Sequence, residues 1–135
     1  MTIKAVIAAA LVLGCLAFTF ALLHSPVFER GERHEFYTGT SSDEIVLARS
    51  PLEKLLLSNI KGESVRYEGD RAEELIARFN AEILFTEEAA GVTNYYCYSP
   101  MLKGGVVLCG ALVNLHVAVS GNRTAAGTPV IFGGF

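Results

Sequence analysis

Positive charge is scarce in the last third of this chain. From residue 89 to residue 135 the only charged side chains are Lys103 and Arg123, whereas all fourteen acidic residues lie within residues 29–88. Eleven Lys and Arg residues are present, and without Lys4 ten remain past residue 23, which gives that part a net charge of −4. Because nucleic acid binding needs many cations facing the phosphates, we expect no nucleic acid partner.

The chain also lacks the usual patterns of metal and phosphate chemistry. His24 and His34 stand apart from the third histidine, and no close cluster of Cys, His and Asp exists. The glycine pairs at 104–105 and 133–134 are not followed by the Lys-Ser/Thr of a phosphate-binding loop. The sequence therefore predicts no metal site and no cofactor.

One long apolar run stands near the start of the chain. Residues 5–23 (AVIAAALVLGCLAFTFALL) carry no charge and follow Lys4. About 20 apolar residues in a helix match the roughly 30 Å hydrocarbon core of a bilayer. The small-x-small cleavage pattern is poor, which favours an uncleaved single-pass anchor in contact with membrane lipid over a removed signal peptide. In either case we expect the rest of the chain outside the cytoplasm, anchored at the cell membrane or secreted.

The remaining residues predict one small domain. We expect an anchor or signal segment at 1–23, a juxtamembrane linker without firm structure at 24–42, and a domain at 43–135. Helix starts are indicated at Ser50, before a proline, and at Asp70, which has a glutamate three residues on. Residues rich in β-formers gather in the second half of the chain. This order predicts an α+β fold, an antiparallel sheet backed by two helices.

Two cysteines are spaced for a cross-strand pair. If the chain forms a hairpin centred on Lys103, Cys97 and Cys109 lie opposite each other, close enough for a disulfide. Export would permit that bond. The alternative is two reduced cysteines packed in the sheet.

A recognition surface is indicated by tyrosines and nearby polar residues. Strand alternation puts Tyr96 and Tyr98 on one face, and tyrosine suits a half-wet surface because it has an apolar body and a polar tip. The same alternation groups His116 with Asn114 and Ala118 on the less buried face of the next strand. Roles in the core or in covering the sheet are the alternative for the tyrosines.

Three segments resemble a known family. Residues 96–100 (YCYSP), 113–119 (VNLHVAV) and 127–131 (GTPVI) resemble the C-terminal part of the YwmB-like family of exported bacterial proteins. The resemblance covers residues 63–135. It implies a fold similar to one lobe of the TATA-box-binding protein, a curved antiparallel sheet backed by helices. It implies no established activity and no known catalytic residues, and the fold alone does not imply DNA binding.

Two functional hypotheses follow. The first is a non-catalytic binding module at the bacterial cell envelope, recognising an envelope protein or a glycan through Tyr96, Tyr98, Asn114 and His116. The alternative is an envelope thiol enzyme or hydrolase that uses Cys97 or Cys109 as nucleophile with His116 as base.

Overall fold

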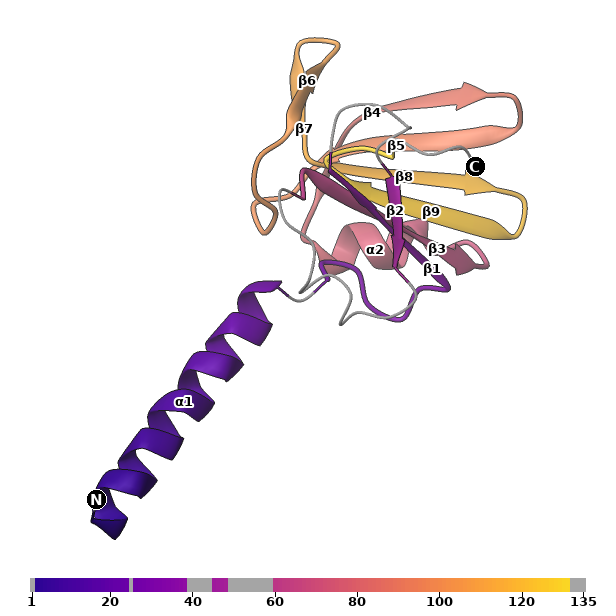
Figure 1. Cartoon of the computed structure of the whole chain (residues 1–135). Coiled ribbons are helices and arrows are strands. Elements are labelled where there is room, and N and C mark those ends of the chain that lie inside the picture. The colour runs from indigo at the N-terminus through magenta and orange to yellow at the C-terminus, as the bar shows by residue number, and fades with distance from the viewer. Residues whose placement is uncertain (1, 25, 39–44, 49–59, 132–135) are drawn as a thin grey trace.

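The computed structural model describes residues 2–24, 26–38, 45–48 and 60–131. Seven strands form one antiparallel sheet in the order β2-β1-β3-β9-β8-β5-β4, and two more form a separate hairpin (Figure 1). The elements are α1 (Ile3–His24), β1 (Arg33–Tyr37), β2 (Ile45–Ala48), β3 (Gly62–Glu68), α2 (Ala72–Arg78), β4 (Glu82–Ala89), β5 (Val92–Tyr98), β6 (Val106–Leu108), β7 (Ala111–Val113), β8 (Leu115–Ser120) and β9 (Arg123–Thr128). The predicted α+β class is confirmed.

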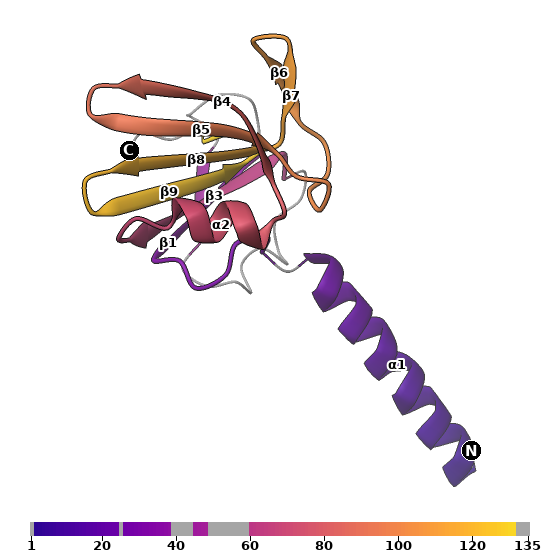
Figure 2. The ribbon, with the colours of Figure 1, turned by 180° about the vertical axis from the view of Figure 1, so that it is seen from behind.

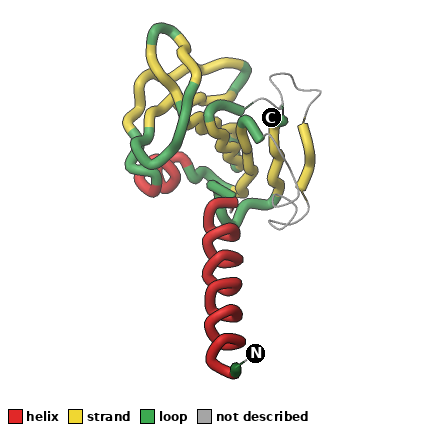
Figure 3. Tube along the Cα trace, turned by 60° about the vertical axis from the view of Figure 1, so that its left-hand side comes forward, coloured by secondary structure: helices red, strands yellow, loops and turns green. Residues whose placement is uncertain are grey.

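The apolar run forms α1, which leaves the domain as a separate rod (Figures 1 and 3). Its 22 residues span about 33 Å at 1.5 Å per residue. From Ile3 to Leu22 none of its side chains is buried against protein. A helix that is apolar on every side and is not buried against protein is suited to lipid. By length and composition, α1 can serve as a signal anchor or a membrane span.

Tight turns join two pairs of neighbouring strands, β4 with β5 and β8 with β9. The hairpin between β4 and β5 turns at Ala90 and Gly91, whose φ angles are 52° and 78°. Positive φ at both central residues gives a two-residue turn whose twist matches the flanking strands. β8 and β9 turn at Gly121, where φ is 55°. These short connections make β4 and β5, and β8 and β9, antiparallel neighbours in the sheet.

The core lies between the sheet and α2, which covers one face of it (Figure 2). The N-cap of α2 is Arg71, one residue after the predicted Asp70. The Asp70 carboxylate accepts a hydrogen bond from the Ala72 backbone N–H at 3.1 Å, which satisfies one donor of the first turn. Leu75 and Phe79 then face the sheet, as helical spacing requires. The buried core cluster comprises Phe28, Val65, Ala72, Leu75, Phe79, Cys97, Leu115, Val117 and Ala126.

The prediction of a linker without firm structure at 24–42 is wrong for residues 26–38, the part of that segment described after α1. Phe28 is 1% exposed and belongs to the core, where its ring meets Phe79 edge-on with centroids 5.5 Å apart. Strand β1 follows and pairs with β3. Buried Glu63 on β3 holds the entry to the domain, because its carboxylate accepts hydrogen bonds from the Val27 and Phe28 backbone N–H groups. The helix predicted to begin at Ser50 lies outside the described residues.

Candidate functional site

Three aromatic rings stack across the sheet on the face opposite α2. Strand register places Phe85 of β4, Tyr96 of β5 and His116 of β8 in one transverse row. The Phe85 and Tyr96 centroids lie 4.6 Å apart, and those of Tyr96 and His116 lie 4.5 Å apart. The interplanar angles of 20° and 16° show near-parallel stacking. Because side chains alternate along a strand, all three rings point away from α2.

The chain end that follows β9 covers the row beside His116. A Cβ atom on Gly127, the residue paired with His116, would lie 2.8 Å from the backbone of Val130 and Ile131. Glycine is therefore needed there for the chain to pass so close to the sheet.

His116 is held as a neutral ring. The Ile131 backbone N–H donates to its Nδ1 at 3.1 Å, and its Nε2 lies 2.9 Å from the Asn94 Oδ1. A backbone amide only donates, so Nδ1 carries no proton and Nε2–H donates to Asn94. Burial lowers the pKa of His116 to about 4, since desolvation penalises the charged ring. The ring is thus neutral at physiological pH.

Tyr96 and Tyr98 of β5 lie on the more open side of this face. The Tyr96 hydroxyl donates to the Glu87 carboxylate at 3.3 Å, and burial, with Glu87 nearby, raises the pKa of Tyr96. Tyr98 is 38% exposed. The predicted grouping of these two tyrosines on one face agrees with the register, since Tyr96 pairs with His116 and Cys97 pairs with Leu115.

The prediction that His116, Asn114 and Ala118 lie on a less buried face is wrong. They are 8%, 0% and 2% exposed. Asn114 is a structural residue: its amide oxygen accepts from the Ser99 backbone N–H at 2.7 Å, and its Nδ2 donates to the carbonyls of Ser99 and Leu102 at 2.8 and 3.2 Å. It fixes the loop after β5 and is not available to a ligand.

Of the two alternatives for Cys97 and Cys109, the disulfide is wrong, because both residues are free thiols. β5 pairs with β4 and β8, and the hairpin turns at Cys109, not at Lys103. Cys97 is buried in the core, where burial raises its pKa to about 11. Since Cys97 faces α2 and His116 faces away from it, the structure does not bring this nucleophile and base together.

Sequence reasoning missed a cavity lined by arginines at one end of this face. Its volume is about 220 Å³, and Arg33, Arg66 and Arg123 line it from three neighbouring strands. Arg33 pairs with Glu35, whose side chain is 7% exposed, at 3.0 Å. Strand alternation could have placed each arginine on a face of its own strand. That the three lie together depends on the β3–β9 pairing, which joins residues about 60 positions apart.

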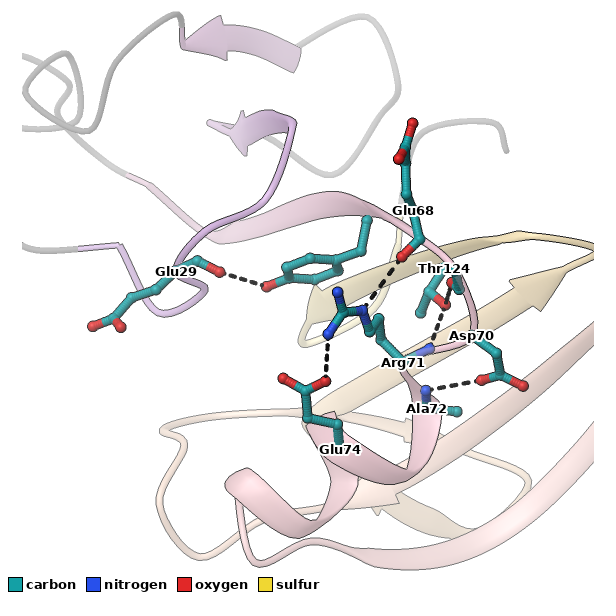
Figure 4. Close-up of polar contacts among 9 residues, drawn as sticks. Glu29, Glu68, Asp70, Arg71, Ala72, Glu74 and Thr124 are labelled. Atoms are coloured by element: carbon teal, nitrogen blue, oxygen red, sulfur yellow. Dashed lines mark hydrogen bonds and ion pairs between the residues drawn. The ribbon is translucent and has the colours of Figure 1, made fainter.

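A larger cavity beside α2, about 560 Å³, is lined by further arginines, of which Arg71 and Arg78 are paired with acids. Arg71 contacts Glu74 at 2.7 Å, and Arg78 contacts Glu29 at 3.0 Å (Figure 4 shows the Arg71 contacts). Tyr67 donates to the Glu29 carbonyl at 3.1 Å, and burial raises its pKa to about 12. The Arg78–Glu29 pair attaches α2 to the entry segment, and the Tyr67 hydroxyl attaches β3 to it, so these contacts have a structural role.

Within the described residues, no group of three His, Cys, Asp or Glu side chains is placed to hold a metal ion. Comparisons of the chain with protein-family models, curated proteins and solved structures found no match. The structure alone therefore defines the class of protein, which is a small α+β domain that follows an apolar helix. The resemblance to the YwmB-like family and to a TATA-box-binding-protein lobe stays a prediction.

Proposed function

We propose that this protein is a membrane-tethered, non-catalytic binding module of the bacterial cell envelope, and that its binding element is the edge strand β4. The tether is supported by α1, whose exposed apolar surface needs lipid around it. A binding role, as opposed to thiol catalysis at Cys97, is supported by the separation of Cys97 from His116 and by the raised pKa of Cys97.

The observation that carries the proposal is the position and composition of β4. It ends the seven-stranded sheet, and no described strand pairs with its outer edge. Such an edge presents unpaired N–H and C=O groups that can accept a further strand. Phe85 stacks on Tyr96 with one ring face and directs the other toward this edge.

Acidic residues on β4 specify the chemistry of the partner. Glu82, Glu87 and Glu88 are exposed along the strand, and a bulge between Ile83 and Phe85 interrupts the register. Edge charges and bulges oppose pairing with a second copy of the same strand, since like charges would face each other. An extended partner segment with Lys or Arg at alternate positions has the complementary charge.

A polypeptide partner is favoured over a glycan by the geometry of the rings. Tyr96 is stacked between Phe85 and His116, so both of its faces are occupied by protein. A sugar ring could not stack on Tyr96, whereas a strand would gain main-chain hydrogen bonds along β4.

The test is binding of defined peptides to the full chain in a non-ionic detergent. We expect a fluorescent ten-residue peptide of alternating Lys and Val to bind, and one of alternating Glu and Val not to bind, measured by anisotropy. Phe85→Ala weakens binding about fivefold, because a ring contact of this kind is worth about 1 kcal/mol. Glu88→Gln weakens it about twofold, because an exposed ion pair is worth about 0.5 kcal/mol.

The matched control is Glu73→Gln on α2, which removes the same charge from an exposed position away from β4. It should leave binding unchanged. Equal binding of the two peptides, or equal losses for Glu88→Gln and Glu73→Gln, would exclude strand addition at β4.

A further inference from the structure

A cavity of about 530 Å³ lies where α1 joins the domain. Leu22, in the last turns of α1, lines it together with Pro26 and Val27 of the entry segment. Met101, Leu102 and Lys103 line it from the loop between β5 and β6, which comes down beside the end of α1 in both ribbon views (Figures 1 and 2). We call this space the juxtamembrane cavity.

The lining of the juxtamembrane cavity combines cations with apolar surface. Among the described residues that follow α1, the lysines are Lys61 and Lys103, and both line it. Both are exposed. Met101 is 62% exposed beside Lys103. This pairing contrasts with the net charge of −4 past residue 23.

The one carboxylate in the lining is engaged by the protein backbone. Glu63 is 4% exposed and accepts hydrogen bonds from the Val27 and Phe28 backbone N–H groups. Its charge is thus directed at the entry segment, and the two lysine ammonium groups remain the exposed charges of the cavity.

We propose that the juxtamembrane cavity binds the phosphate headgroup of an anionic phospholipid, with Lys61 and Lys103 at the phosphate and Met101 at the acyl boundary. The inference rests on the proposed function, because it requires that α1 stays in the membrane. With residues up to Leu22 in the hydrocarbon core, the cavity stands at headgroup depth, which extends about 6 Å beyond the core. Lysines at that level attract anionic lipid, and a polarisable, flexible Met side chain is suited to apolar contact.

The experiment uses the full chain purified in a non-ionic detergent. Its intact mass is measured first, and then its binding of phosphatidylglycerol and of phosphatidylcholine with identical acyl chains is titrated by native mass spectrometry. We expect at least tenfold tighter binding of phosphatidylglycerol. Lys61→Gln and Lys103→Gln each weaken that binding about fivefold, and Lys61→Arg and Lys103→Arg retain it.

Arg123→Gln is the matched control, since it removes one exposed cation from the first position of β9. It should leave lipid binding unchanged. Equal affinity for the two lipids, or equal effects of the lysine variants and the control, would overturn the inference while leaving the tether intact. Inorganic phosphate that displaces phosphatidylglycerol at millimolar concentration with the same lysine dependence would assign the site to soluble phosphate. An intact mass without residues 1–23 would overturn the tether and this inference together.

Discussion

At the scale of single residues, His116 does the most to organise the face opposite α2. Its ring stacks on Tyr96, its Nε2 bonds Asn94, and its Nδ1 receives the amide of Ile131. The described partners of the ring are all uncharged, so nothing among them offsets the cost of a buried imidazolium. Protonation would also break the bond from Ile131, because a protonated Nδ1 cannot accept.

Stability should therefore fall as the pH is lowered. The pKa of His116 is about 4 in the folded protein and near 6.5 when unfolded, so the unfolded chain binds more protons between these values. The contribution of the neutral His116 ring to the free energy of unfolding is fully present above pH 6.5. It is lost progressively down to pH 4, and amounts to about 3 kcal/mol at most. Thermal unfolding of the detergent-solubilised chain from pH 8 to pH 4, with His116→Gln alongside, measures it.

The His116→Gln variant should be less stable than the natural chain at pH 8, and this difference in stability should become smaller toward pH 4. A gap that stays constant across this range would show that His116 titrates normally in the folded protein.

The residue-scale predictions succeeded where strand alternation was enough and failed where pairing partners mattered. Alternation separates Tyr96 from Cys97 whatever lies beside β5, and the structure agrees. The Cys97–Cys109 bridge needed those strands to pair with each other. Cys109 instead sits in a two-residue turn with Gly110, with φ angles of 49° and 77°, and residues 106–113 form their own hairpin. A Cys-Gly pair between two β-rich triplets was the available signal for this turn.

At the scale of elements, the loop between β5 and β6 depends on Asn114. Its side chain makes hydrogen bonds to the backbone of Ser99 and Leu102, which have no neighbouring strand among the described residues to provide them. Its backbone N–H donates to the Cys97 carbonyl at 3.1 Å. Because this loop carries Met101 and Lys103, the geometry of the juxtamembrane cavity depends on a residue buried behind it.

Asn114→Ala should destabilise the domain by about 2 kcal/mol and lower Tm by about 10 °C, because buried groups of Ser99 lose their partners. Hydrogen exchange of the amides at 99–105 should increase. Asn122→Ala, in the exposed turn before β9, is the control and should change stability by less than about 0.5 kcal/mol. An equal loss in both variants would show that the loop is held by other contacts.

The missed strand β1 shows what local pattern cannot provide. Its sequence, RHEFY, is bounded by glycine and short polar stretches, and it lacks a long alternating pattern. It becomes a strand because β3 offers it an edge, with Phe36 opposite Glu63 and both buried. Tertiary pairing of this kind overrides weak local preference. The turn residues in 24–42 therefore favour a linker locally, but pairing with β3 makes residues 33–37 a strand.

At the scale of the whole molecule, the apolar helix and the domain are distinct in composition and contacts. The side chains of α1 that the structure describes are exposed, whereas the domain has its own core and its own charge. The sequence predicted this division because the uncharged run is unambiguous in length. Which side of the membrane carries the domain is a property of the positive charges flanking the run, and these are nearly balanced between Lys4 on one side and Arg30 and Arg33 on the other.

The natural cysteines allow the membrane topology to be measured without the introduction of new ones. Cys109 is exposed at the turn of the β6–β7 hairpin, on the side of the domain away from α1 (Figures 1 and 2), whereas Cys97 is buried. With the domain outside the cytoplasm, a membrane-impermeant maleimide added to intact cells should modify the chain once. Cys109→Ser should abolish the label and Cys15→Ser should leave it, since Cys15 lies within the apolar helix.

The labelled chain should stay with the membrane in alkaline carbonate, because a 22-residue apolar helix is too costly to transfer to water. Labelling that requires cell lysis would place the domain in the cytoplasm, and a labelled chain released by carbonate would identify α1 as a cleaved signal.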